Sequence, residues 1–469
     1  MKIPKTVNNL ANVFQQSGHC LFLVGGAVRD ELLGVGSHDY DFATDATPQE
    51  VTAMFRNVIP VGIQHGTVVV LFEGQQFEVT TFRTEGDYSD NRHPDEVHFV
   101  RNIDEDLSRR DFTINALAWD LQNSCLKDNF DGKGDLNRKV IRAIGNPDER
   151  FSEDALRMLR ACRFAAKLEF TIDEETLASM TRLSHLIQNI SEERIRDEFI
   201  KMMGSPRPSV GIEYMRVSGL LDFILPELMK GYGVVQNRFH KYDVYYHNVY
   251  SCDAAPADNY IVRIAALFHD IAKPQTKRAK ADEPENENEN SFYNHDIVGE
   301  RIAKHILRRL KFTNEDTKQI RHLIKNHMFY YTDDWTDGAV RRFLRKVGVD
   351  NLPDLFALRE ADRLGNGTKA GIPKAFIDFQ DRIKHILEVD AALKVSDLDI
   401  NGNDIMTTLN LTPGPIIGEI LSYLLELVLD NPEINTHETL MERAEEYYNK
   451  KKDYCMEQYG RPPEQLGRF

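Results

Sequence analysis

The sequence has few cysteines and no long apolar run, and both absences narrow what the protein can be. The cysteines are scattered and form no C-x-x-C pair, so neither a disulfide framework nor a cysteine zinc site is expected. No apolar run approaches the roughly 20 residues that span a bilayer, and the N-terminal MKIPKTVNNLANVF lacks the layout of a secretory signal. We therefore expect a cytoplasmic protein without a membrane segment.

A net positive charge is also absent. The formal net charge is −16, which argues against a protein that coats nucleic acid non-specifically. It does not exclude an RNA substrate, because a local basic surface is what contacts phosphates. The charge is indeed uneven: residues 157–167 are strongly basic, whereas residues 281–290 and 421–446 lean acidic. At 469 residues the chain is too long for one core and should hold several domains.

The stretch LVGGAVRDELLGVGSHDYDFATD, residues 23–45, combines a glycine pair with paired aspartates. It predicts a short apolar strand, then Gly25-Gly26, a helix, and a second strand that carries Asp39 and Asp41. Glycines before a helix let backbone N–H groups approach a phosphate. Alternate residues of a strand share a face, so Asp39 and Asp41 project side by side, and hard carboxylate ligands suit Mg²⁺.

Each of these features alone is weak evidence. A lone Gly-Gly is usually only a turn, and D-x-D is often a pair of solvated carboxylates at a strand end. In strand–GG–helix–strand order they together indicate a nucleotide site. GGAVRD followed by HDYDFATD resembles the class II tRNA nucleotidyltransferases, which comprise the CCA-adding enzymes and the bacterial poly(A) polymerases. The resemblance implies a head domain like that of DNA polymerase β.

Two later stretches extend the resemblance. GTVVVLFEGQQFEVTTFR predicts a β-hairpin, in which Glu78 is either an edge-strand charge or, by resemblance, a third metal-binding carboxylate. DLSRRDFTINALAWD predicts a helix over residues 112–120, and arginines near its start are unfavourable without an anion. That anion could be a triphosphate or the carboxylate of Asp111. The run resembles the family motif RRD-F-T-x-N-A, which implies that Arg110 binds the incoming nucleotide, and that Gly26 and Arg29 bind its phosphates and sugar.

Residues 84–98, TEGDYSDNRHPDEVH, are polar and turn-rich and predict a mobile loop. In the family that the chain resembles, the loop at this place is linked to addition of the final A. Its presence favours an enzyme that can add A.

The stretch FSEDALRMLRACRFAAKLEF predicts a helix capped by Ser152. Asp154 and Arg157, one turn apart, can meet one ligand edge. Cytosine and adenine place an amino donor beside an unprotonated ring nitrogen, so a carboxylate and a guanidinium would admit them and reject uracil and guanine. EDALR also resembles the family motif EDxxR, whose Asp and Arg select CTP and ATP. Arg160 and Arg163 continue the helix and are further candidates for nucleotide binding.

Histidines become frequent after residue 240. In helical context they form, with two aspartates, the pattern H…HD…H…H…D: His247, His269, Asp270, His295, His327 and Asp362. Imidazole with carboxylate suits a divalent transition metal such as Mn, Ni, Co or Fe, besides Mg²⁺. The pattern resembles the HD-domain phosphohydrolases, whose metals activate water against a phosphate ester. The alternative is a structural remnant in an RNA-binding tail.

We therefore expect an α+β protein: a polymerase-β-like head followed by helical parts. The expected domains are the nucleotidyltransferase head (1–145), a neck and body for nucleotide selection and RNA binding (146–230), an inserted helical HD domain (231–368) and a helical RNA-binding tail (369–469).

The expected function is untemplated addition or repair of the tRNA 3′-terminal CCA from CTP and ATP, with Mg²⁺ on Asp39 and Asp41 and with no protein partner evident. A poly(A) polymerase or a partial CC- or A-adding enzyme would share these motifs. An alternative of another class is an HD phosphohydrolase whose head only binds nucleotide.

Overall fold

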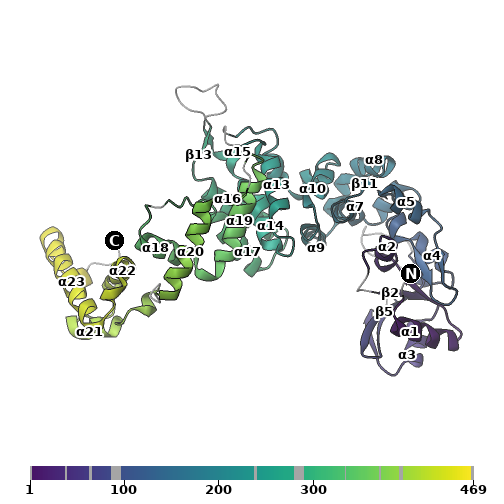
Figure 1. Cartoon of the computed structure of the whole chain (residues 1–469), viewed down its shortest axis with the longest axis horizontal. Helices are drawn as coiled ribbons and strands as arrows, with labels where there is room; N and C mark the ends of the chain where they lie inside the picture. The colour runs from purple at the N-terminus through teal and green to yellow at the C-terminus, as the bar shows by residue number, and fades with distance from the viewer. Residues whose placement is uncertain are drawn as a thin grey trace. The chain divides into compact units, whose positions relative to one another are not determined.

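The computed structural model describes residues 3–36, 40–62, 66–85, 97–236, 240–278, 290–332, 334–368, 371–389 and 394–465. Asp39 and most of the predicted 84–98 loop lie outside these ranges. The chain divides into two compact units, Met1–Ile324 with Ala361–Thr368, and Lys325–Glu360 with Lys369–Phe469. We describe each unit by itself; Figure 1 labels their elements.

The N-terminal part of the first unit is built on a seven-stranded mixed sheet of order β3-β4-β5-β2-β1-β8-β9 in the described residues. Its strands are β1 (Leu21–Val24), β2 (Asp41–Thr44), β3 (Val58–Gly62), β4 (Thr67–Phe72), β5 (Gln75–Thr81), β8 (Ala118–Asp120) and β9 (Cys125–Lys127). The all-apolar β1 is buried along its length, and it pairs antiparallel with β2 and β8. An α+β head, as the sequence predicts, is confirmed.

The predicted hairpin is confirmed as β4 and β5. Phe72 pairs with Gln75, so the loop is the two residues Glu73 and Gly74, both with positive φ (49° and 77°). That is the backbone of a type I′ turn, which matches the twist of the flanking strands. On its other side β5 pairs in parallel with β2.

The predicted helix over residues 112–120 is wrong. Thr113–Asn115 form only a single 3₁₀ turn, η2, and Ala118–Asp120 form β8, between β1 and β9. Leu117 and Ala118 are fully buried. Pairing with β1 and burial in the core outweigh the weak helix preference of this Ala- and Leu-containing run.

Helices cover the sheet and continue beyond it. In the head they are α1 (Lys5–Gln16), α2 (Gly26–Leu32), α3 (Pro48–Met54), α4 (Ile103–Ser108) and α5 (Gly132–Arg138). The body helices are α6 (Pro147–Glu153), α7 (Leu156–Leu168), α8 (Glu174–Leu183), α9 (Glu192–Met203), α10 (Pro208–Val217), α11 (Leu220–Ile224) and α12 (Pro226–Met229). Small strand pairs are β6 (Arg83–Glu85) with β7 (Val97–Phe99), and β10 (Val140–Ile141) with β11 (Thr171–Ile172).

The predicted helix that begins at Ser152 is also corrected. Ser152 lies inside α6, whose N-cap is Asn146, with a side chain that accepts from the Asp148 N–H, and with a proline in the first turn. The helix stops at Glu153 because Asp154 is extended, with φ −143° and ψ 102°. Asn146-Pro147 is the stronger start signal, since it combines a side-chain cap with a preset φ.

The histidine-rich segment follows the body. Its elements are α13 (Val244–Ala254), α14 (Tyr260–Phe268), α15 (Lys273–Thr276), β12 (Lys277–Arg278), β13 (Ser291–Phe292), α16 (His295–Arg309) and α17 (Asn314–Asn326).

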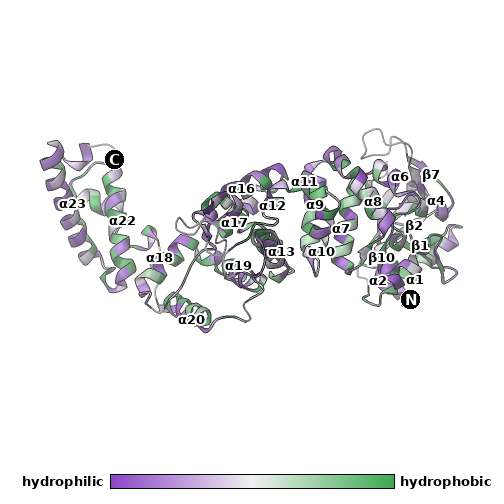
Figure 2. Cartoon of the chain, turned by 90° about the horizontal axis from the view of Figure 1, so that it is seen from above, coloured by the Kyte–Doolittle hydropathy of each residue, from purple (hydrophilic) through white to green (hydrophobic). Residues whose placement is uncertain are grey.

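The second unit holds α18 (Asp337–Val347), α20 (Lys374–Val389), α21 (Gly402–Leu409), α22 (Pro415–Asp430) and α23 (His437–Tyr459), while α19 (Leu352–Gly365) crosses the division. α22 and α23 share a buried apolar core that includes Ile420, Leu424 and Leu440. In Figure 2 the ribbons of these helices carry both hydrophobic and hydrophilic residues, as expected for amphipathic helices. Among the described residues, no helix is both long enough and apolar enough to cross a membrane.

A buried arginine fastens the histidine-rich helices to the body. Arg263 of α14 is 2% exposed. Its guanidinium donates to the carbonyl oxygens of Met203 and Ser205, at the end of α9, and to that of Ala255. A cation near the C-terminal end of a helix is favourable, and the orphan carbonyls there need donors.

We expect Arg263→Met to destabilise the folded chain by about 2–4 kcal/mol, because it leaves buried carbonyl oxygens without donors. Urea unfolding followed by circular dichroism measures the change. The control is Arg308→Met on the exposed side of α16, which should shift stability by about 0.5 kcal/mol or less. Equal effects of the two substitutions would contradict this role of Arg263.

Candidate active site

The glycine pair forms a tight turn between β1 and α2. Gly25 has φ +65°, a conformation that favours glycine. A Cβ at Gly25 would lie 3.0 Å from Nη1 of Arg110, and a Cβ at Gly26 would lie 3.5 Å from Nη2 of Arg29. The backbone of this turn therefore comes within contact distance of a cationic side chain from another element. Nε of Arg110 is buried and has no hydrogen-bond partner among the described residues. This arrangement suits an anion.

The arginines of the RRD run are held by Asp106. This buried carboxylate accepts from Arg109 Nε and Nη2 at 3.0 and 2.8 Å and from Arg110 Nη2 at 3.3 Å. Burial alone would raise the pKa of Asp106, but the two guanidinium groups hold it below its ordinary value. Asp106 is thus the carboxylate that pairs with both arginines. From the sequence, Asp111 was the carboxylate considered for this position.

Asp41 and Glu78 are neighbours on adjacent parallel strands. The register pairs Asp41 of β2 with Glu78 of β5, and both residues are exposed. Residues paired in register project toward the same face of a sheet. Two of the three predicted metal-binding carboxylates therefore share a face, while Asp39 lies outside the described residues.

Asp154 and Arg157 lie where α6 ends and α7 begins. The Arg157 N–H donates to the Asp154 carbonyl at 3.0 Å, so the two residues are one turn apart, as predicted. Asp154 Oδ1 accepts from the Leu156 N–H at 3.1 Å, and Oδ2 accepts from Arg194 at 2.7 Å. Buried Arg157 donates to Glu153 at 2.5 Å and to the Arg109 carbonyl at 3.1 Å. Arg157 therefore connects the start of α7 to the RRD run.

A chain of hydrogen bonds connects the glycine turn to α7. Arg29, which is 3% exposed, donates to Asp30 and, at 2.7 Å, to Asn115 Oδ1. Asn115 donates to Asp111 Oδ1 at 3.0 Å, and Asp111 Oδ2 accepts from Arg160 at 2.6 and 2.9 Å. Burial opposes ionisation of Asp111, yet Arg160 and the hydrogen bonds lower its pKa to about 2. Asp111 therefore stays charged and fixes Arg160 against the head.

Arg163 is held in a similar way. Its Nε donates to the buried Glu198 of α9 at 2.5 Å. Its guanidinium lies 4.2 Å from the ring centre of Phe164, and that of Arg29 lies 5.3 Å from the same ring. Both guanidinium groups are within cation–π range. Arg29 and Arg163 are thus both buried, and both already have protein partners. Their contact with the nucleotide stays a prediction.

Four predicted metal ligands converge in the histidine-rich segment. His247 Nε2 lies 3.0 Å from His269 Nε2, 3.3 Å from Asp270 Oδ2 and 3.2 Å from Asp362 Oδ1. His269 Nε2 lies 3.2 and 3.6 Å from the same two carboxylate oxygens. Donor atoms about 2.0–2.2 Å from a shared divalent ion have such separations. Nδ1 of His269 is 2.7 Å from the Ala266 carbonyl, which can only accept, so Nε2 is left to ligate.

The electrostatics of this cluster also call for a cation. Burial opposes charge on His269, yet the carboxylates of Asp270 and Asp362 raise its pKa to about 10. Burial likewise opposes ionisation of these carboxyl groups, and the surrounding cationic groups hold the pKa of each well below its ordinary value. Two ionised carboxylates beside imidazole nitrogens match the ligand chemistry of a divalent ion, which would take the place of the proton on His269.

A fifth predicted ligand, His295, lies beside Asp270 in the first unit. His295 Nε2 lies 3.2 Å from Asp270 Oδ1, so this carboxylate faces histidines on both of its oxygens. His327 is buried and follows α17 in the second unit.

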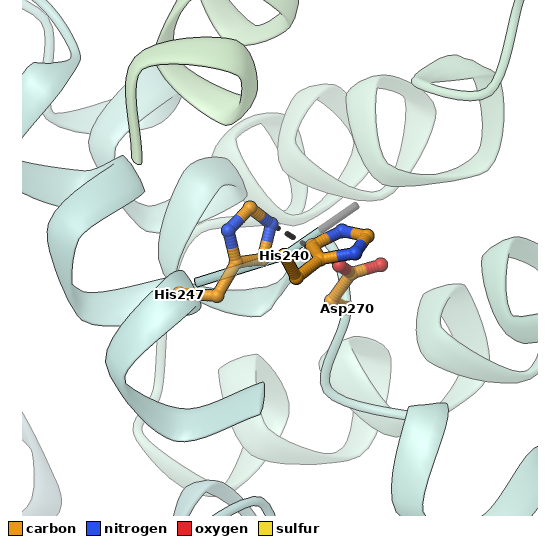
Figure 3. A group of neighbouring side chains, drawn as sticks. All are labelled: His240, His247 and Asp270. Carbon is orange, nitrogen blue, oxygen red and sulfur yellow. Dashed lines mark ion pairs between the residues drawn. The ribbon is translucent and has the colours of Figure 1, made fainter. Parts of the chain in front are cut away.

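Sequence reasoning missed His240 and Lys273. The nitrogen of His240 lies within 4.8 Å of ligand atoms of His247 and Asp270, and Figure 3 shows these three side chains grouped together. Lys273 Nζ lies 2.5 Å from Asp270 Oδ2 and 2.6 Å from Gln236 Oε1. The i, i+3 spacing of Asp270 and Lys273 could have revealed Lys273. His240 follows three residues outside the described ranges and stands on no helix, so no periodic pattern marked it.

Three protein-family models match the chain. They are "Poly A polymerase head domain" (residues 21–142), "Probable RNA and SrmB- binding site of polymerase A" (169–231) and tRNA nucleotidyltransferase domain 2 (293–444).

Curated relatives match over nearly the whole chain. The CCA-adding enzyme of Enterococcus faecalis is 34% identical over 456 residues, which cover 96% of this chain and 98% of the relative. That of Leuconostoc mesenteroides is 32% identical over 446 residues, 93% of this chain and 94% of the relative.

Solved structures agree. A crystal structure of the Bacillus stearothermophilus CCA-adding enzyme in complex with CTP has a TM-score of 0.73 and 27% identity, and the match covers 97% of this chain and 100% of that one. The Thermotoga maritima CCA-adding enzyme complexed with tRNA_CCA shares the fold, with a TM-score of 0.54, 19% identity, and coverage of 95% and 96%. The motifs, the mixed-sheet head and these full-length relatives agree, and the chain belongs to the CCA-adding enzyme family of nucleotidyltransferases.

Proposed function

We propose that this protein builds or repairs the 3′-terminal CCA of tRNA from CTP and ATP without a nucleic-acid template. The observation that carries the proposal is the Asp154–Arg157 pair, a carboxylate and a guanidinium one turn apart, with Arg157 connected to the RRD run. The proposed domains are a head (1–145), a neck and body (146–230), an HD domain (231–368) and a helical tail (369–469). The N-terminal family model, residues 21–142, lies within the proposed head.

The carboxylates of the head form the proposed chemical centre. Asp39, Asp41 and Glu78 would hold Mg²⁺, and the shared face of Asp41 and Glu78 supports this set. Bound divalent ions would activate the RNA 3′-hydroxyl and neutralise the triphosphate. Gly25 and Gly26 leave room for a phosphate beside Arg110, whose unpartnered Nε can donate to it. Through its bond to Asn115, Arg29 would keep the helix after this turn in place.

Base choice would lie in the protein. The Asp154 carboxylate accepts from the amino group of cytosine or adenine, and the Arg157 guanidinium donates to the adjacent ring nitrogen. Uracil or guanine would place a carbonyl against the carboxylate and an N–H against the guanidinium. Such a mismatch would leave polar groups of Asp154, Arg157 and the base without hydrogen-bond partners. Because the two side chains are largely buried, this is costly and gives steep discrimination.

We propose a second, metal-dependent activity at the HD centre: hydrolysis of a phosphate ester. The convergence of His247, His269, Asp270 and Asp362 supports it. Asp270 also faces His295, so its two oxygens serve different sides of the centre. A divalent transition metal or Mg²⁺ would supply an activated water there. Lys273, beside Asp270, can pair with an incoming phosphate.

Asp41→Ala and Asp39→Ala should each lower tRNA extension by more than about a hundredfold, because each removes a proposed metal ligand. Binding of tRNA should be nearly unchanged, since neither carboxylate contacts RNA in this scheme. Extension of tRNA lacking CCA measures the first effect, and a filter-binding titration measures the second. Asp131→Ala, which removes an exposed head carboxylate that pairs with Arg138, is the control. Extension by either aspartate variant at a near wild-type rate would contradict the proposal.

Exchange of Asp154 and Arg157 should reverse base preference. Asp154→Arg with Arg157→Asp donates to a carbonyl and accepts from a ring N–H, the pattern of uracil and guanine. Since a correct bidentate contact is worth roughly 1–3 kcal/mol, preference should move by about tenfold or more. The measurement is relative kcat/KM for the four nucleoside triphosphates. An active double variant with unaltered C and A preference would place selection elsewhere.

The two sites should be separable. His269→Ala with Asp270→Ala should abolish metal-dependent phosphatase activity and bound divalent metal. It should leave CTP and ATP addition within about twofold, because the ligand groups found among the described residues contain no residue of the head. Phosphate release, metal analysis by mass spectrometry and tRNA extension give the three readouts. The control is His305→Ala, an exposed histidine of α16. Loss of tRNA extension in a folded double variant would show that the sites are not independent.

A further inference from the structure

Asp154 makes a contact that base selection by Asp154 and Arg157 alone does not explain. Its Oδ2 accepts from Nη2 of Arg194, a residue of α9, at 2.7 Å. The two side chains are partly buried, 27% exposed for Arg194 and 15% for Asp154. Asp154 Oδ1 accepts from the Leu156 N–H. One fixed donor on each oxygen defines the plane of this carboxyl group.

Arg194 has donor capacity left. Its Nη1 is buried and has no hydrogen-bond partner among the described residues. Buried guanidinium N–H groups normally have an acceptor, so one without a partner beside Asp154 points to a ligand. Arg194 also lies in the first turn of α9, where a cation opposes the helix dipole. Its position is unfavourable for the helix itself, which argues for a role outside α9.

We propose that Arg194 is a positioning residue of base selection, and that its Nη1–H donates to an acceptor on the bound nucleoside triphosphate. The inference rests on the proposed role of Asp154. A carboxylate oxygen accepts more than one hydrogen bond, so Asp154 can hold Arg194 and the amino group of cytosine or adenine together. Without Arg194 the carboxyl group is free to rotate, and its contact with the amino group loses direction.

The structure offers a matched control on the same helix. Arg196, two residues along α9, donates to Asp197 and to the carbonyl of Lys311, so its partners among the described residues differ from that of Arg194. Arg196→Met removes a guanidinium and its ion pair from α9 as Arg194→Met does, without touching the selection pair.

The experiment measures kcat/KM for CTP and UTP on tRNA lacking CCA, and reports their ratio. Arg194→Met should lower the ratio about tenfold, the effect of one lost directional contact to a base, and should raise KM for CTP. Arg194→Lys should give a smaller fall of the ratio, because it keeps the charge and loses the planar fork. If Arg194→Met does not fold, the ratio measured for Arg194→Lys tests the proposal in its place. Arg196→Met should leave the ratio unchanged.

Asp154→Asn and its combination with Arg194→Met separate the possible failures. If Arg194 acts through Asp154, the combined variant should have the same ratio as Asp154→Asn alone. An unchanged ratio in Asp154→Asn would overturn the proposed role of Asp154 itself. A lowered ratio in Asp154→Asn with an unchanged ratio in both Arg194 variants would overturn only the present inference. Equal loss of activity toward CTP and UTP in the Arg194 variants would do the same, since it would mark a purely structural ion pair.

Discussion

Ion pairs between buried or partly buried arginines and buried carboxylates are the constraint on which the nucleotide site depends. A buried charge without a partner is costly, so each guanidinium of the site needs a fixed acceptor. Arg160 has Asp111, Arg163 has Glu198, and Arg109 with Arg110 share Asp106. Asp111 and Glu198 stand on other elements than Arg160 and Arg163 of α7, so these two ion pairs fix α7 against the head and against α9.

The proposed HD centre has an excess of negative charge instead. Asp270 and Asp362 bring negative charge into a buried cluster whose other members are histidines, and Lys273 is the nearest fixed cation in contact with Asp270. Imidazole nitrogens and carboxylate oxygens lie 3.0–3.6 Å from one another there, the separations expected of ligand atoms that share one metal ion. The proposed divalent ion would join these ligand atoms. The proposed nucleotide site has unused donors instead: among the described residues, Arg110 Nε in the head and Arg194 Nη1 on α9 have no hydrogen-bond partner, which suits a triphosphate and its base.

Local sequence signals predicted what local forces decide. The β4–β5 hairpin follows from a Glu-Gly turn between β-rich runs, and the Gly25 turn follows from its glycine pair. Tertiary contacts overrode local preference at residues 112–120, where β8 pairs with β1. Asp154 was predicted inside a helix, but it lies between α6 and α7 with an extended backbone. Its carboxylate there pairs with Arg194 of α9, a contact that local sequence does not encode. No helix period could reveal Arg194 or His240, because the carboxylate that pairs with Arg194 lies outside α9 and His240 stands on no helix, whereas the i, i+3 spacing of Asp270 and Lys273 was present in the sequence.

The central claim is that the protein alone dictates a finite C-C-A sequence. It is tested most directly by incubation of the wild-type protein and Mg²⁺ with tRNA lacking CCA and an equal mixture of all four nucleoside triphosphates, followed by sequencing of the tRNA 3′ ends. The account predicts ends that terminate in CCA, with U and G incorporated rarely. Tails of A alone, or C and A mixed with U and G at comparable frequency, would contradict it.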